Sequence, residues 1–244
     1  MSQNSSAEMG KNRTGIAMSP INAKAVAEGA KESPPSSSGD RHTQDALKAF
    51  YLEQNERIGS VPPPANLKGV AKTALKMIQG EKATVLVDKL AERLAFERTG
   101  TRLYEAIIGK AEVLAEQSGP RVDELEKIHH EELSHFHMLK GYLENLGGDP
   151  TAQTPSADVV GVASSGLLKV ITDPRTTMPQ SLQALLIAEL ADNEGWSTLI
   201  KLAEGFNQDQ MAADFRTALE AEERHLMQVR GWLSARIQEE AGTA

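Results

Sequence analysis

The sequence predicts an all-α protein built on four long helices with one long crossover connection, preceded by a disordered tail and accessory helices. Three observations lead to this fold class. The 244 residues are rich in Leu, Ala, Glu and Lys but contain only 2 Trp, 3 Tyr and 5 Phe, a composition that favours helices over β-strands. Long stretches from residue 81 onward repeat apolar residues at helical spacing. Breaks that contain Gly or Pro separate these stretches.

The N-terminal part of the chain, residues 1–80, is expected to contribute little to the hydrophobic core. Residues 1–42 are rich in Ser, Pro, Gly and Ala and contain hardly any large apolar residues. Because such a segment cannot bury enough surface to offset its ordering entropy, we predict a disordered tail. Residues 43–80 carry two short helical patterns, over 43–57 and 66–79, separated by the stop signal GSVPPPAN. These accessory helices either pack on the main domain or bind a partner.

The main domain is predicted over residues 81–240. Apolar spacing and stop signals predict long helices over 83–117, 122–146, 180–204 and 210–239. The first two and the last two are joined by short loops, which indicates two antiparallel hairpins. A longer connection, with a short helix over 157–171, joins the hairpins and forms the single crossover.

The two hairpins look like copies of one ancestral unit. The second helix of each contains Glu-x-x-His, followed six residues later by Gly, an aromatic residue and Leu, at Glu132 with His135 and at Glu222 with His225. The first helices correspond too, because Glu97 and Glu189 occupy the same place in them, 92 residues apart. The matching positions therefore include polar residues.

Helical phase places these polar residues on the apolar stripes of their helices. At 100° per residue, Leu90 lies within about 40° of Glu97, and Leu185 lies equally close to Glu189. Four buried carboxylates without counter-charge cost several kcal/mol each, and the stripes are expected to offer no Lys or Arg that neutralises them. Two divalent metal ions would balance that charge, with two neutral imidazoles completing the ligand set. Carboxylate and imidazole ligands suit iron or manganese.

This arrangement resembles the ferritin-like di-iron carboxylate superfamily, which includes rubrerythrins, bacterioferritins and manganese catalases. The resemblance covers roughly residues 81–240. It implies a ferritin-like four-helix bundle, in which Glu132 and Glu222 bridge two metals and the whole ligand set is Glu97, Glu132, His135, Glu189, Glu222 and His225. Because the chain has no Cys, it lacks the Cys-rich rubredoxin module of rubrerythrins.

For several polar residues close to the stripes, the sequence leaves two roles open. Asp192 either hydrogen-bonds a ligating His and orients its ring or forms a salt bridge on the flank of the helix. Glu131 and His129 either support the metal ligands from outside or face solvent. Glu105 is a candidate for an expanded ligand shell.

The sequence also leads to expectations for two aromatic residues and for polar residues that face away from the site. Tyr104 and Trp196 pack in the core or take part in redox chemistry. Helical phase points His130 and His137 away from the predicted site, so we predict that they lie at the surface. Glu194 is turned far from the direction of Glu189, which makes it a poor alternative ligand.

The resemblance implies a dinuclear iron protein, a ferroxidase or another di-iron oxidoreductase. It would oxidise Fe(II) or reduce dioxygen or hydrogen peroxide, with an external electron donor as a further partner. Two iron ions are the expected cofactor. Manganese is the alternative, because the same ligands permit the peroxide dismutation of manganese catalases. A third interpretation is a bundle that binds metal, or serves as a scaffold, without redox chemistry.

Composition excludes several other classes of function. The absence of Cys excludes disulfides, thiol catalysis and thiolate metal sites. A net charge of −8 without a basic patch argues against nucleic acid as a partner. No apolar stretch approaches the ~20 residues of a membrane span, and the N-terminus lacks a signal-peptide pattern. We therefore expect a cytoplasmic protein without a membrane partner, with a homo-oligomer as one arrangement it can adopt.

Overall fold

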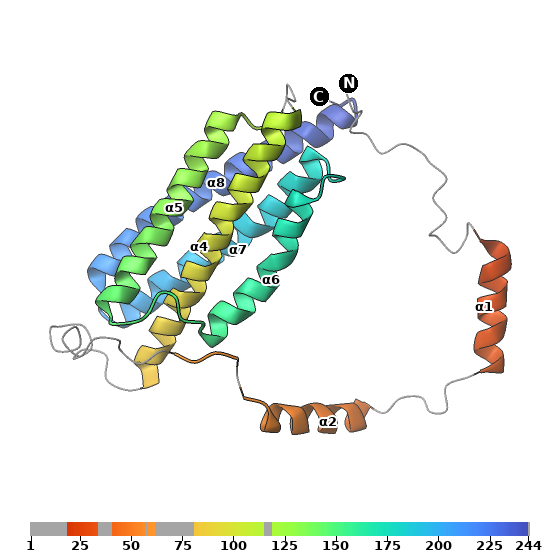
Figure 1. The fold of residues 1–244 in the computed structure, drawn as a ribbon, viewed down its shortest axis with the longest axis horizontal. Coiled ribbons are helices and arrows are strands. Elements are labelled where there is room, and N and C mark those ends of the chain that lie inside the picture. Colours follow the sequence, from red (N-terminus) through yellow and green to blue (C-terminus); the bar gives the residue numbers. More distant parts are fainter. Residues whose placement is uncertain (1–18, 34–40, 57, 62–80, 115–118, 244) are drawn as a thin grey trace. The chain divides into compact units, whose positions relative to one another are not determined.

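The computed structural model describes residues 19–33, 41–56, 58–61, 81–114 and 119–243 (Figure 1). All regular secondary structure in these residues is helical, which confirms the predicted all-α class. The chain divides into two units, Met1–Glu56 and Arg57–Ala244. The accessory helix predicted over 66–79 lies outside the described residues.

The first unit contains two helices, α1 (Pro20–Glu32) and α2 (Arg41–Gln54). Helix α2 corresponds to the helix predicted over 43–57. Helix α1 lies within the segment 1–42 that is predicted as a disordered tail, of which residues 1–18 and 34–40 lie outside the described residues. Its sequence PINAKAVAEGAKE combines Pro in the first turn with several alanines, which are features that favour a helix locally. Since α1 buries no residue, core-forming capacity could not reveal it.

The second unit contains the predicted long helices and the shorter helix between the hairpins. Each described boundary lies within three residues of its prediction. The helices are α4 (Glu81–Leu114), α5 (Val122–Asn145), α6 (Pro155–Thr172), α7 (Met178–Gly205) and α8 (Asp209–Glu240).

Local signals fix the helix ends in and beside the crossover. The Thr154 hydroxyl accepts a hydrogen bond from the Ala157 N–H at the start of α6. Thr177 and Gln180 form a reciprocal capping box at the start of α7. Gly147, just after α5, has a φ of 81°, a left-handed conformation that suits glycine and turns the chain away from the helix axis.

Packing joins the two hairpins into one unit. Helix α4 packs on α5 and α7 packs on α8, and the hairpins meet where α4 contacts α7 and α5 contacts α8. Helix α6 lies along α4 and α7 on the outside of this arrangement (Figure 1). None of the helices in the described part of the chain is long and apolar enough to cross a membrane.

The buried interior consists of two apolar clusters with a polar layer between them. The first cluster is built around Leu90, Leu139, Trp196 and Phe215, and the second includes Leu103, Leu125, Leu182 and Val229. On α5, α7 and α8, the glutamates and histidines of the predicted site lie between the residues of one cluster and those of the other, and on α4 Glu97 follows Leu94 of the first cluster and Phe96 of the second. The fold therefore confines the polar side chains to one level of the interior.

Candidate metal centre

All six residues predicted as metal ligands are buried and meet in the polar layer. Each of the helices α4, α5, α7 and α8 contributes at least one of them. Their ligand atoms form overlapping sets, in each of which the atoms lie within 4.8 Å of one another. The sets are Glu132, Glu189, Glu222 and His225; Glu97, His135 and Glu222; and Glu97, Glu132, Asp192 and Glu222. Glu222 belongs to all three.

The two histidines contact different oxygens of the Glu222 carboxylate. His135 Nδ1 lies 2.6 Å from Glu222 Oε1 and 3.8 Å from Glu97 Oε2. His225 Nδ1 lies 3.0 Å from Glu222 Oε2 and 3.5 Å from Glu132 Oε1. The Nδ1 atoms of both rings therefore face the carboxylates of the polar layer.

Buried Arg93 corrects the expectation that no cation lies on the stripes. Its Nε is 3.3 Å from Glu97 Oε1, and its Nη1 is 3.0 Å from Asp192 Oδ1. Asp192 is also buried, so of its two interpretations the salt bridge holds, within the core rather than on a flank. The charges of Arg93 and Asp192 cancel, which leaves the four glutamates with the charge of −4 that two divalent ions would balance.

Two glycines create the space that these polar side chains occupy. A Cβ added at Gly195 would overlap the Arg93 guanidinium, and one added at Gly100 would overlap the carboxylate end of Glu132. Neither glycine was identified from the sequence, because a close approach between two helices leaves no trace in the periodicity of one.

The contacts of the residues around the ligand set decide between most of the interpretations that the sequence left open. Glu131 supports the site, because its Oε2 lies 2.6 Å from His225 Nε2. His129 Nε2 lies 3.6 Å from Glu105 Oε1, and neither residue belongs to the sets above. The Tyr104 hydroxyl donates a 2.5 Å hydrogen bond to Glu189 Oε1.

Trp196 lies in the core, and the residues that face away from the site are exposed. Trp196 packs in the first apolar cluster, with its ring edge-on to His135 at a centroid distance of 5.4 Å. His130 and His137 are exposed, as helical phase predicted, and Glu194 is also exposed.

Electrostatics in the metal-free cluster favours protonated carboxyl groups. Burial is the main cause that raises the pKa of Glu97, of Glu189 and of Glu132, the last to about 8. Repulsion adds to it, since Asp192 further raises the pKa of Glu97 and Glu222 that of Glu132. Burial also raises the pKa of Asp192 to about 7, although the Arg93 guanidinium acts against it.

Glu222 and His225 form the charged pair of the cluster. Burial acts to raise the pKa of Glu222, but its contacts with His135 and His225 outweigh burial and lower this pKa to about 2. Burial acts to lower the pKa of His225, yet Glu132 and Glu222 raise it to about 11. His225 is therefore protonated in the absence of metal, and a metal ion that binds Nδ1 has to displace this proton.

The residues present fit a divalent metal pair. Several buried ligand atoms have no hydrogen-bond partner within the described residues, among them Glu132 Oε2, Glu189 Oε2, Glu222 Oε1 and His135 Nδ1. The last two lie 2.6 Å apart as an ion pair. Buried polar atoms without partners are costly, so these atoms call for a cation. Oxygen and imidazole nitrogen suit iron, manganese or zinc rather than soft metals.

Replacing Gly100 with alanine is expected to weaken metal binding without removing any ligand. The new Cβ would overlap the end of the Glu132 side chain, which can move, so the helix persists while the carboxylate leaves its position. We expect at least a tenfold loss of affinity, about 1.4 kcal/mol, in equilibrium dialysis with Mn²⁺. Gly109→Ala on the same helix is the matched control, because its Cβ would meet no atom within 4 Å. Equal affinities in the two variants would contradict this role of Gly100.

Comparison with protein families, with curated proteins and with solved structures gives no match for this chain. Its class therefore rests on the fold and the site. The described chain is an all-helical protein with a buried carboxylate and histidine cluster that can hold a metal.

Proposed function

We propose that this chain is a ferritin-like dinuclear metal protein that holds two iron ions and oxidises Fe(II) or reduces dioxygen or peroxide. One observation carries the proposal: four helices bring six buried carboxylate and imidazole ligands to one level of the core, in sets that share Glu222. A Glu from each of two helices and a Glu-x-x-His from each of two others is the ligand pattern of di-iron and di-manganese carboxylate bundles.

The overlap of the sets divides the ligands between two metal positions. We assign Glu189 and His225 to one position, and Glu97 and His135 to the other. Glu222, which belongs to every set, and Glu132, which belongs to two, would be shared by both metals. The two positions are called the 189/225 position and the 97/135 position below.

The surrounding residues prepare the ligands for this role. When bound, the metals supply the redox equivalents and the Lewis acidity. Glu131 accepts a hydrogen bond from His225 Nε2 and thereby directs Nδ1 toward the carboxylates. The Tyr104 hydroxyl donates a hydrogen bond to Glu189 Oε1 and so orients this carboxylate. The apolar clusters on either side keep bulk water from the layer.

Elemental analysis of the purified chain tests the proposal directly. After anaerobic loading with Fe(II), we expect two iron ions per chain, and Fe(II) in excess should be oxidised on exposure to air or peroxide. Glu223→Ala and His137→Ala are suitable controls, because both residues are exposed close in sequence to ligands. A chain that binds no divalent metal would overturn the proposal. Stable binding of manganese with oxygen release from peroxide would instead favour the catalase reaction, and metal binding without turnover a non-redox role.

A further inference from the structure

The two hairpins differ in three residues that lie around Glu97 and its neighbours. With the offset of 92 residues that relates Glu97 to Glu189, Arg93 corresponds to Leu185, and Gly195 corresponds to Leu103. By the same offset, Asp192 corresponds to Gly100. Thus the cation has a leucine as its counterpart, the carboxylate has a glycine, and the glycine has a leucine.

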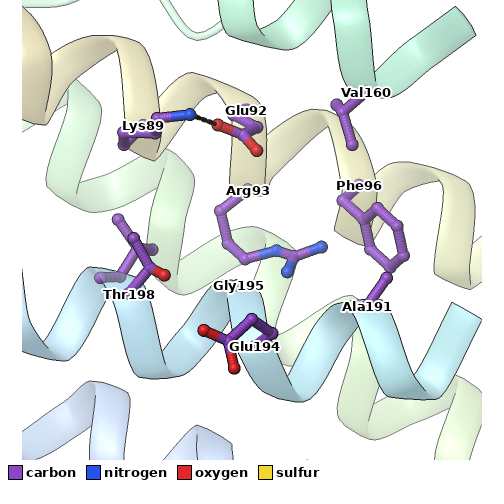
Figure 2. Close-up of a pocket in the computed structure, with 10 residues that line it drawn as sticks. Lys89, Glu92, Arg93, Phe96, Val160, Ala191, Glu194, Gly195 and Thr198 are labelled. Carbon is purple, nitrogen blue, oxygen red and sulfur yellow. Dashed lines mark hydrogen bonds and ion pairs between the residues drawn. The ribbon is translucent and has the colours of Figure 1, made fainter. Parts of the chain in front are cut away.

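These three residues form one contacting unit. Arg93 Nη1 lies 3.0 Å from Asp192 Oδ1 and 3.2 Å from the Asp192 carbonyl oxygen. The guanidinium occupies the space that a side chain at Gly195 would fill. Figure 2 shows Arg93 extending from α4 toward Gly195 on α7. Three departures from the repeat that depend on one another in space indicate a built feature rather than chance variation.

This unit acts on one half of the layer. Arg93 Nε lies 3.3 Å from Glu97 Oε1 and so competes with any metal for that oxygen. At the corresponding place before Glu189 stands Leu185, which is fully buried and apolar. The partner of the Glu189 carboxylate is the neutral Tyr104 hydroxyl. A divalent ion at the 97/135 position therefore competes with the Arg93 guanidinium for Glu97 Oε1, whereas apolar Leu185 stands at the corresponding place beside Glu189.

Asp192 keeps the guanidinium in place when Glu97 turns to a metal. Because Arg93 has two oxygens of Asp192 as partners, loss of its contact with Glu97 does not leave it unpaired. It also borders a pocket of about 350 Å³ between α4 and α7, with Glu194 on the opposite wall. The guanidinium therefore stays beside the 97/135 position after loading, and its competition for Glu97 Oε1 persists.

We propose that Arg93 makes the two metal positions unequal, so that a divalent ion fills the 189/225 position first and the 97/135 position second and more weakly. The inference rests on the proposed function and concerns the order in which the same cluster is loaded. It assigns Arg93 the role of a positioning residue, since it acts on the metal through Glu97.

Titration with Mn²⁺ alone tests the inference without any turnover. The free ion is counted by electron paramagnetic resonance in equilibrium dialysis, and we expect two steps whose dissociation constants differ about tenfold or more. Glu97→Gln should remove the weak step and Glu189→Gln the tight one. This assigns each step to a position.

Arg93→Leu, which copies Leu185, should tighten the second step about tenfold or more and change the first little. Arg93→Gln is the second variant if the leucine variant does not fold, because the adjoining pocket admits water beside the shorter polar chain. Lys89→Leu is the matched control: Lys89 lines the same pocket on the same helix but pairs with Glu92. In this control, the two dissociation constants for Mn²⁺ should differ as much as they do in the wild-type chain.

The outcomes separate the two proposals. Two Mn²⁺ ions bound with equal affinity to the wild-type chain, or an unchanged ratio of constants in both Arg93 variants, would overturn the inference and leave the proposed function standing. Absence of any bound Mn²⁺ or Fe(II) in the wild-type chain would overturn both. A loss of the tight step rather than the weak one in Glu97→Gln would reverse the proposed order and contradict the role of Arg93.

Discussion

Replacing Glu222 with alanine is expected to abolish binding of both metal ions, the largest loss that a single substitution in the cluster produces. Glu222 is the only residue common to all three sets of ligand atoms found in the described chain. Its two oxygens contact the two histidines separately, Oε1 with His135 and Oε2 with His225. Its removal therefore takes a ligand from each metal position at once.

Ligands on one side of the cluster should behave differently. Glu189 and His225 belong to a single set, so Glu189→Ala or His225→Ala should leave about one ion per chain at the 97/135 position. Glu132→Ala should follow Glu222→Ala, because Glu132 belongs to sets on both sides. Metal counted by mass spectrometry after loading and dialysis distinguishes these results.

Exposed neighbours serve as controls for this series. Glu223→Ala, Glu194→Ala and His130→Ala should retain two ions, since these side chains are exposed. If Glu194→Ala emptied the site while Glu189→Ala did not, the assignment of the α7 ligand would be wrong. Two retained ions in Glu222→Ala would show that this carboxylate is not shared.

The six cluster residues could be predicted from the sequence because two independent regularities agree on them. The repeat pairs Glu132 with Glu222 and Glu97 with Glu189, and helical phase places the same residues on apolar stripes. Either signal alone is weak, since Glu and His are common on helices. Helix boundaries followed from Gly and Pro breaks for the same local reason.

Arg93 escaped prediction although part of its signal is local. It precedes Glu97 by four residues and so lies on the same face of α4. Its burial, however, depends on the absence of a side chain at Gly195 of another helix. Glu131 was ambiguous for a similar reason: its phase points beside the site, and only the approach of α8 brings His225 within 2.6 Å. Contacts between helices decide such cases, and the periodicity of one helix does not contain them.

The metal-free protein is expected to lose stability as the pH rises from 5 to 8. An ordinary glutamate has a pKa of 4.5, whereas the pKa of Glu132 in the folded chain is about 8. Burial raises this pKa, and the nearby Glu222 carboxylate raises it further. Between these values the folded state binds more protons than the unfolded state, so the free energy of unfolding falls with increasing pH. The raised pKa values of Asp192 and His225 act in the same direction, the latter above pH 6.5. The lowered pKa of Glu222 acts oppositely, but only below pH 4.5.

Bound metal should reverse this trend, because its charge replaces the protons that the cluster holds at low pH. We expect saturating Mn²⁺ to raise the melting temperature more at pH 8 than at pH 5.5, where protons compete for the same carboxylates. An effect of a few kcal/mol corresponds to a difference on the order of 5–10 °C for a chain of this size. Differential scanning fluorimetry in strong chelator and in Mn²⁺ across this pH range measures it.

Glu132→Gln separates the contribution of the cluster from that of surface charge. The amide imitates the protonated carboxyl group, so the metal-free variant should melt higher than the metal-free wild-type chain at pH 8 and at nearly the same temperature at pH 5. The same variant should gain little from Mn²⁺, because a shared ligand is lost. Glu223→Gln, which changes an exposed charge beside the cluster, should follow the wild-type chain in both respects. If the two variants had identical pH profiles, the buried carboxylates would not be the source of the pH dependence, and the metals would not be replacing their protons.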